Sequence, residues 1–375
     1  MARLLQAVIV SHFHGQPARD ESSVQAAISP VDWRSGKEVG AILATYLQDR
    51  LGAGKLLYAD GPTEVPQGWE AYTYRFRLEA DKRLPPPFAQ PLCLRAYENP
   101  QARLRARQGF AALAHMRTLS YPVPEPLLLE EDCQFFGGPF IIMPWLSGVT
   151  LLDKLKQHFT YILRVSDQLA RLHLTLHNLP AAGFPAPAAP FIERRLDELS
   201  AMIHDYGLSG LKPGLAWLQA HRPGQTQAPS ILHLDFHPIY LMVDADRPKG
   251  VLDLGESDLG DRHADIGMTL VLLRSAPVDV STPSERGLAR PARWWMARRY
   301  LRTYARHFPL DRTVLRYYVA WAALRRLAVC GVWLREGPQV TGFKRSSLQY
   351  ASRAHLRGLQ GCFRQAAGVP VPLAC

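Results

Sequence analysis

Two aspartates that follow short apolar runs are the side chains of this sequence best suited to chemistry. Asp235 lies in Ile231-Leu-His-Leu-Asp-Phe-His-Pro, and Asp253 closes the run Gly250-Val-Leu-Asp eighteen residues later. The two runs surround a polar turn, so we expect a strand hairpin with one carboxylate beyond each strand. Paired carboxylates in such a place can hold Mg²⁺ and orient a hydroxyl, as phosphoryl transfer requires.

Other kinds of catalytic or metal site are poorly supported. His233 and His237 are four residues apart, which suits a zinc pair on a helix, but strand and turn signals surround them. Gly36-Lys-Glu and Gly54-Lys-Leu lack the Ser or Thr of a P-loop, and neither Gly-x-Ser-x-Gly nor His-Glu-x-x-His occurs. The alternative that Asp235 and Asp253 are unrelated surface residues is also poorly supported. One 29-residue stretch holds His233, Asp235, His237, Asp253 and Asp261.

The elements that must position these residues change in character near residue 145. Strand-like runs dominate before it, and helical spacing dominates after it, which indicates an α+β chain in two lobes joined near Met143–Gly148. The sequence predicts helices over 39–52, 100–119, 151–156 and 162–179, strands over 72–78, 92–97 and 140–143, and helices again from 291 onward.

Composition and charge exclude several classes of protein. The 375 residues are 47% hydrophobic and 21% charged, as in folded proteins, and no apolar run reaches the ~18 residues of a membrane span. Five scattered cysteines without a Cys-x-x-Cys pair favour reduced thiols over disulfides or zinc. No signal-peptide cleavage site follows the first residues, so we expect a cytoplasmic protein.

The positive charge is concentrated near the end of the sequence. The net charge is +11, yet residues 290–360 alone hold 15 Lys and Arg against Asp311 and Glu336. This excess suits an anionic ligand, nucleic acid or an acidic partner, or else helices whose arginine stems cover apolar surface. The aromatic residues among the arginines favour helices of the large lobe over a detachable tail.

The sequence resembles the aminoglycoside phosphotransferase and choline kinase-like family, whose members have a protein kinase-like fold. His-Leu-Asp-Phe-His-Pro, Val-Leu-Asp-Leu-Gly and Gly260-Asp-Arg-His-Ala-Asp265 are similar to its catalytic core. The stretch beginning at Gln67 resembles the nucleotide-covering hairpin, and Leu92-Cys-Leu-Arg resembles the strand with the phosphate-binding cation. The resemblance covers roughly residues 38–275 and implies ATP and Mg²⁺ as cofactors.

The resemblance implies a role for each matching residue. Asp235 would orient and deprotonate the acceptor hydroxyl, with His233 packed beneath the catalytic turn, and Asp253 would hold Mg²⁺. Arg95 would contact the nucleotide phosphates, where Arg is a sound ligand because of its planar fork. The remaining nucleotide-binding positions are Gly68 in the covering hairpin and Met143 and Trp145 at the hinge.

Two positions depart from the family pattern. The family has Asn five residues after the catalytic Asp as a second metal ligand, and this sequence has Tyr240, whose neutral phenol is a poor substitute. The helix glutamate that pairs with the phosphate-binding cation falls at Gln108 or Gly109, neither of which can form an ion pair. Glu256 is a candidate substitute metal contact.

Three functions remain open from the sequence. The first is an ATP-dependent phosphotransferase acting on a small-molecule hydroxyl, and the second is a catalytically impaired pseudokinase that binds nucleotide or a metabolite as a regulator or scaffold. The third, nucleic-acid binding, rests only on the basic segment and is disfavoured; no membrane partner is expected. The expected domains are an extension (1–37), a small nucleotide-binding lobe (38–146) and a large catalytic and substrate lobe (147–375).

Overall fold

The strands that precede residue 145 form one antiparallel sheet. The computed structural model describes residues 31–373, except for 34, 53, 67, 80–83, 225–227, 246 and 277–282. The sheet order is β1-β2-β3-β5-β4, with every neighbouring pair antiparallel. The bounds are Tyr58–Glu64 (β1), Ala71–Leu78 (β2), Leu92–Tyr97 (β3), Leu128–Glu130 (β4) and Phe140–Pro144 (β5). The three strands predicted from the sequence are confirmed.

The central strand β3 shows how the sheet positions a functional side chain. Leu92, Leu94 and Ala96 are fully buried. Because alternate residues of a strand point to opposite faces, Cys93 and Arg95 face the other side of the sheet. The alternation of apolar and other residues along this strand therefore fixes the face of the sheet on which Arg95 lies.

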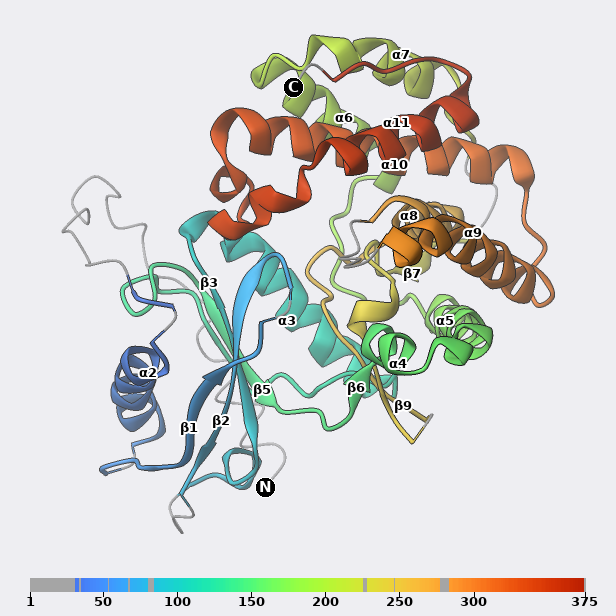
Figure 1. Cartoon of the computed structure of the whole chain (residues 1–375). Helices are drawn as coiled ribbons and strands as arrows, with labels where there is room; N and C mark the ends of the chain where they lie inside the picture. Colours follow the sequence, from blue (N-terminus) through green and yellow to red (C-terminus); the bar gives the residue numbers. More distant parts are fainter. Residues whose placement is uncertain are drawn as a thin grey trace. The chain divides into compact units, whose positions relative to one another are not determined.

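Two helices accompany the sheet, both close to their predicted positions (Figure 1). Helix α2 spans Gly36–Leu51, begins where the Ser35 side chain accepts a hydrogen bond from the N–H of Glu38, and ends at Gly52. Gly52 has a φ of 58°, the left-handed conformation that closes many helices. Helix α3 spans Arg103–Thr118 and packs against β4 and β5.

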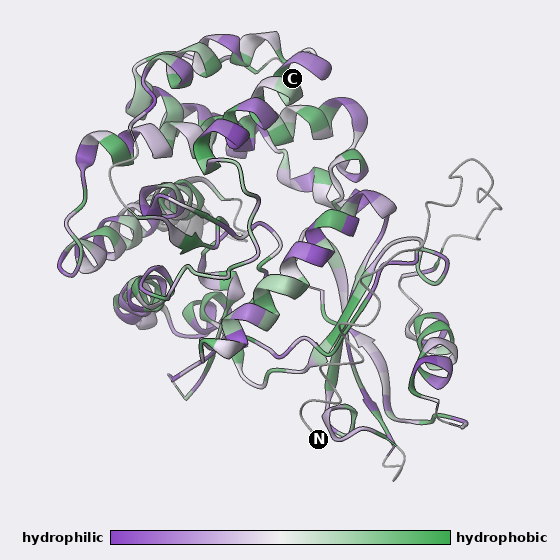
Figure 2. Ribbon diagram, turned by 180° about the vertical axis from the view of Figure 1, so that it is seen from behind, coloured by the Kyte–Doolittle hydropathy of each residue, from purple (hydrophilic) through white to green (hydrophobic). Residues whose placement is uncertain are grey.

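After Trp145 the chain is mainly helical, which confirms the α+β prediction. The helices are α4 (Leu151–Gln157), α5 (Ile162–His177), α6 (Phe191–Asp205), α7 (Lys212–Ala220), α8 (Arg262–Ser275), α9 (Pro283–Ala305), α10 (Arg312–Glu336) and α11 (Arg353–Ala367). The strands are β6 (Val149–Thr150), β7 (Ser230–Leu232), β8 (Leu241–Asp244), β9 (Arg247–Val251) and β10 (Asp258–Gly260). Short 3₁₀ turns lie at Pro86–Phe88, Pro100–Ala102, Phe159–Tyr161, Ser209–Leu211, Pro238–Tyr240, Pro338–Thr341 and Arg345–Tyr350. Hydrophilic and hydrophobic residues alternate along most of these helices, as expected for helices buried on one face (Figure 2).

The predicted hairpin between the two apolar runs is wrong in its pairing. Strand β7 pairs with β10, whereas β8 lies between β6 and β9. Asp235 and Asp253 therefore follow strands of two different small sheets. The prediction paired two apolar runs that are close in the sequence. The 3₁₀ turn Pro238–Tyr240 and strand β8 lie between these runs, and β8 takes the place beside β9.

The arginine-rich helices belong to the large core, as predicted. Tyr300 and Tyr304 of α9 and Trp321 of α10 are fully buried, and Trp321 packs edge-on against Phe191. Trp294 is an exception, with 57% of its surface exposed. The arginines between these aromatics lie on the remaining helix surface, where several form ion pairs described below.

The structure leaves the predicted domain boundaries untested. Residues 32–375 form one compact unit, and most of the expected extension 1–37 lies outside the described residues. The division at residues 146 and 147 thus stays a prediction. In the part of the chain that the structure describes, no helix is long and apolar enough to span a membrane.

Because several histidines are buried, we expect the folded protein to lose stability in mild acid. Burial lowers the pKa of His355 to about 4 and those of His177 and His237 to about 3. Between pH 6.5 and 4 the unfolded chain binds these protons and the folded chain does not, so stability falls as the pH falls, by about 1.4 kcal/mol per pH unit for each histidine. Denaturant unfolding of wild type between pH 7 and 4 should show this slope.

The contribution of one histidine can be separated with two variants. His355→Gln should reduce the slope by about one proton, or about 1.4 kcal/mol per pH unit, because its Nδ1 lies 2.6 Å from the Ser275 carbonyl in the buried neutral form. His204→Gln, at an exposed position, serves as the control and should leave the slope unchanged. Equal slopes for wild type and His355→Gln would contradict the buried neutral state.

Candidate active site

One buried carboxylate holds the turn that follows β7. Asp265, on α8, accepts hydrogen bonds from the backbone N–H of His233 (2.6 Å) and of Leu234 (2.8 Å). Leu234 has a φ of 63°, a left-handed conformation that costs a non-glycine residue about 1–2 kcal/mol. The hydrogen bonds offset this cost, and they fix the direction in which Asp235 leaves the turn.

Two histidines of α5 hold Asp265 in turn. Nε2 of His173 and Nε2 of His177 lie 2.9 and 3.2 Å from Oδ2 of Asp265, and their Nδ1 atoms each lie 2.7 Å from the hydroxyls of Tyr300 and Tyr304. Burial alone would raise the pKa of Asp265, yet the two histidines hold it well below its usual value. The three side chains are close enough to share a metal ion, but these hydrogen bonds already use the ligand atoms.

His233 lies beneath the turn, where the sequence placed it, and lines neither of the cavities described below. Its Nδ1 accepts a hydrogen bond from the N–H of Asp235 (3.2 Å), and its Nε2 donates to the Leu252 carbonyl (2.9 Å). His233 thus connects the turn before Asp235 with the segment before Asp253. Its geometry gives it a positioning role, without contact to a reacting group.

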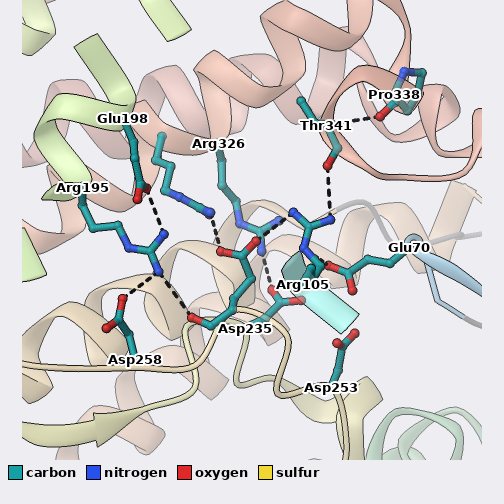
Figure 3. A network of polar contacts seen from close by, with 12 residues as sticks. Glu70, Arg105, Arg195, Glu198, Asp235, Asp253, Asp258, Arg326, Pro338 and Thr341 are labelled. Carbon is teal, nitrogen blue, oxygen red and sulfur yellow. Dashed lines mark hydrogen bonds and ion pairs between the residues drawn. The ribbon is translucent and has the colours of Figure 1, made fainter. Parts of the chain in front are cut away.

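Asp235 faces a small cavity of about 110 Å³. Arg326 of α10 forms an ion pair with its Oδ1 (Figure 3). His237 Nε2 lies 3.8 Å from Oδ2 of Asp235. Burial raises the pKa of Asp235, and the positive charge of Arg326 opposes that shift. Sequence analysis did not predict Arg326, because nothing local links it to a residue 91 positions earlier.

Asp253 faces a second, larger cavity of about 310 Å³. Its φ of 66° is left-handed, a strained conformation of the kind found at functional sites. Nη2 of Arg95 lies 2.7 Å from its Oδ1, and Tyr240 also forms a side-chain hydrogen bond with it. Burial raises the pKa of Asp253, but Arg95 and Tyr240 together bring it below the usual value.

Glu70, which immediately precedes β2, is a second carboxyl partner of Arg95 beside Asp253. Glu70 Oε2 lies 2.8 Å from Nη2 of Arg95, and its Oε1 lies 3.5 Å from Nε of Arg105 on α3. Burial and the nearby carboxylates raise the pKa of Glu70 to about 8. Gly109, where a glutamate was sought, instead packs against the backbone of Gly255; an added Cβ would lie 3.4 Å from its Cα.

Glu256 is committed to arginines, so it does not serve as the substitute metal contact considered from the sequence. Its carboxylate lies 3.0 Å from Nη2 of Arg105 and 2.5 Å from Nη2 of Arg325. Burial raises its pKa, but Arg325 and Arg105 hold the pKa well below the usual value. Glu256 lines the smaller cavity and is absent from the larger one.

The remaining predicted nucleotide-binding residues line the larger cavity. Gly68, Arg95, Met143, Trp145 and Asp253 all belong to its wall. The wall is otherwise largely apolar, as is usual for small-molecule sites, and includes Val65, Ala71, Leu146, Ile239, Met242 and Leu252. The N–H of Trp145 already donates to the Pro91 carbonyl (2.9 Å), so Trp145 offers a ring and a carbonyl to a ligand, but no backbone donor.

The two cavities share part of their walls. Glu70 and Tyr240 line both of them, whereas Asp235 belongs only to the smaller cavity and Asp253 only to the larger. Glu70 and Tyr240 therefore lie between the two cavities, with Asp235 on one side and Asp253 on the other.

Comparisons with solved structures confirm the two-lobed, kinase-like fold. A thermostable mutant of aminoglycoside phosphotransferase APH(4)-Ia, in a ternary complex with AMP-PNP and hygromycin B, is 16% identical; the match covers 87% of this chain and 99% of that chain, with a TM-score of 0.58. An apo form of such a mutant is 17% identical (87% and 100% covered, TM-score 0.57). A GDP complex of an aminoglycoside 2′-phosphotransferase-IIIa mutant is 14% identical (86% and 99% covered, TM-score 0.52).

Sequence comparison identifies the family directly. No curated protein is significantly similar to the chain. The model of the phosphotransferase enzyme family, APH, matches residues 62–282, which is more than half of the chain and contains β2 to β10 and α8. The chain therefore belongs to the phosphotransferase enzyme family.

Proposed function

We propose that this protein transfers the γ-phosphate of ATP to a hydroxyl of a small molecule. The observation that carries the proposal is the placement of Asp235 and Asp253 in two cavities that share Glu70 and Tyr240. The larger cavity suits the nucleotide, because it combines an apolar wall with Arg95. The smaller cavity suits the acceptor, because Asp235 faces it, whereas Glu256 on the same wall is held by Arg105 and Arg325.

Asp235 has the position of a base. In this proposal it accepts a hydrogen bond from the acceptor hydroxyl and takes its proton as the oxygen–phosphorus bond forms, while the bond to the ADP oxygen breaks. A carboxylate with a raised pKa suits this proton transfer better than one with an ordinary value. Arg95 presents its guanidinium to the phosphate oxygens from β3.

Asp253 fits a magnesium site. Its carboxylate faces the larger cavity, and Mg²⁺ prefers oxygen ligands and keeps waters in its other positions, so one protein carboxylate with the nucleotide phosphates suffices. When bound, Mg²⁺ supplies neutralisation of charge on the phosphates. Tyr240 lies beside Asp253 and forms a side-chain hydrogen bond with it, so in this proposal it acts as a donor and not as a metal ligand.

A catalytically impaired pseudokinase is the second candidate. Tyr240 replaces the expected asparagine, and each of the two functional aspartates is already paired, Asp235 with Arg326 and Asp253 with Arg95. These pairs must open or rearrange before an acceptor and a metal can bind. A protein that binds nucleotide without transfer would retain them.

Two substitutions separate the roles of the aspartates. Asp235→Asn should lower kcat by ~10²–10⁴-fold, the usual contribution of a general base, and leave ATP affinity within ~3-fold. Asp253→Asn should instead remove the Mg²⁺-dependent part of ATP affinity. Coupled-assay kinetics and calorimetry of AMP-PNP binding measure the two effects, with Asp244→Asn at an exposed site as the control. Full turnover by Asp235→Asn would contradict the assigned base.

Tyr240 distinguishes the two candidates. In a working kinase that uses one Mg²⁺, Tyr240→Asn should change kcat by less than ~10-fold, or ~1.4 kcal/mol of barrier. Tyr240→Phe, which keeps the ring and removes the hydroxyl at Asp253, controls for packing. We expect measurable wild-type turnover. A wild type that neither binds Mg²⁺–ATP at millimolar concentration nor transfers phosphate would instead support the pseudokinase.

Glu70 predicts a pH dependence of nucleotide affinity. Its pKa of about 8 means that it is mostly protonated at pH 7 and ionised at pH 9. Ionisation adds a negative charge to the nucleotide cavity, so ATP affinity should fall as the pH rises past about 8. Calorimetry at pH 7–9 should show this fall in wild type and in the control Glu64→Gln, and not in Glu70→Gln. A loss of affinity already at pH 7 in Glu70→Gln would mean that Arg95 needs an ionised partner.

A further inference from the structure

The smaller cavity is lined by more arginines than the larger one. Arg105, Arg325 and Arg326 line the smaller cavity, whereas Arg95 is the arginine that lines the larger. Three acidic side chains face the same arginines: Glu70, Asp235 and Glu256. How these charges are paired decides which acceptor the cavity can hold.

Two of the three arginines share one ionised carboxylate. Arg105 and Arg325 both contact Glu256, at 3.0 and 2.5 Å. Glu70 lies 3.5 Å from Arg105 but only 2.8 Å from Arg95, so it pairs more closely with the arginine of the larger cavity. Arg105 and Arg325 are therefore left with Glu256 as their closest carboxylate.

Arg326 is paired with the very carboxylate that the reaction needs. Its Nη2 contacts Oδ1 of Asp235, and its Nε donates to the sulfur of Met268 at 3.4 Å. A guanidinium has five N–H donors, so these two partners within the described chain leave capacity for another acceptor group. When Asp235 takes the proton of the acceptor hydroxyl, its negative charge is neutralised, so the Arg326 guanidinium loses its ionised partner and a second anion can replace it.

We propose, on the basis of the phosphotransferase function above, that the acceptor is an anionic alcohol whose carboxylate or phosphate group binds Arg326 while its hydroxyl binds Asp235. A planar guanidinium binds either group through two parallel hydrogen bonds. A neutral alcohol would compete with Arg326 for Asp235 without compensating the arginine. A cationic amino sugar would meet Arg325 and Arg326 with like charge.

The rest of the cavity suits a compact molecule. Trp69 and Tyr350 stack with ring centroids 4.2 Å apart, and the Arg326 guanidinium carbon lies 6.0 Å from the Trp69 ring. Phe343 and Trp333 also line the cavity, and the guanidinium carbon of Arg105 lies 4.4 Å from the Phe343 ring. The carbon skeleton of the acceptor would pack on these rings, within a volume of about 110 Å³.

Matched acceptors test the proposal. ATP turnover is measured with glycerol, glycerate, glycerol 3-phosphate and 3-amino-1,2-propanediol, and with glucose, glucuronate, glucose 6-phosphate and glucosamine. The skeleton is constant within each series, so charge is the variable, and the two anions separate carboxylate from phosphate recognition. In at least one series, an anionic member should exceed the neutral and cationic members in kcat/KM by ~10-fold or more.

Three variants connect the preference to Arg326. Arg326→Gln should lower the ratio of kcat/KM for the preferred anion to that for the neutral member of the same series by ~10-fold or more, and Arg326→Lys should retain part of the preference. Arg312→Gln, at an exposed position of the same helix, is the control. Best turnover of neutral or cationic members would overturn the proposal. An equal loss of kcat for every acceptor would also overturn it, since Arg326 would then serve the transferred phosphoryl group.

A binding measurement separates this proposal from the proposed function. Calorimetry with AMP-PNP present measures the affinity of the same anions without turnover. Binding that Arg326→Gln abolishes, in a protein that phosphorylates nothing, would support the anion site and count against the phosphotransferase function. Turnover of neutral alcohols alone would support the function and overturn the anion site. Absence of binding by any of these anions would overturn it as well.

Discussion

The buried carboxylate of Asp265 is the constraint on which the candidate site depends. It has no access to solvent, so its charge must be satisfied entirely by the protein, and it receives the backbone of the turn on one side and two histidines on the other. Removing either set would leave an uncompensated buried charge, which commonly costs several kcal/mol. Helices α5, α8 and α9, which supply these groups, therefore have to pack together before Asp235 acquires a defined direction.

A second set of buried charges joins the sheet to the helices. Glu70 and Arg95 come from the sheet, Arg105 from α3, Asp253 and Glu256 from the segment after β9, and Arg325 from α10. Pairs of this kind contribute little net stability, because desolvation offsets most of the attraction. They do penalise any arrangement in which one partner is displaced, and this penalty makes the network a determinant of geometry more than of stability.

Local patterns predicted much of this structure, and contacts between distant segments account for what they missed. Asp235 and Asp253 stand out because a short motif surrounds each of them. Arg326 and Glu70 do not, since Arg326 lies 91 residues from Asp235 and Glu70 lies 25 residues from Arg95, and no periodicity encodes such pairing. Glu256 was misassigned because it is near Asp253 in the sequence, whereas its side chain faces Arg105 and Arg325. The hairpin predicted between the runs that form β7 and β9 failed for the same reason: strands close in sequence need not be neighbours in a sheet.

Trp69 belongs to both halves of the site. It follows Gly68 in the loop beside the nucleotide cavity, its ring stacks on Tyr350 in the wall of the acceptor cavity, and its carbonyl accepts a hydrogen bond from Ser347 at 2.5 Å. A ligand that shifts this loop therefore shifts a wall of the neighbouring cavity. Where two ligands are coupled in this way, the factor by which the first changes the affinity of the second must equal the factor by which the second changes the affinity of the first. The stack therefore ties the shape of the smaller cavity to the loop that borders the larger one.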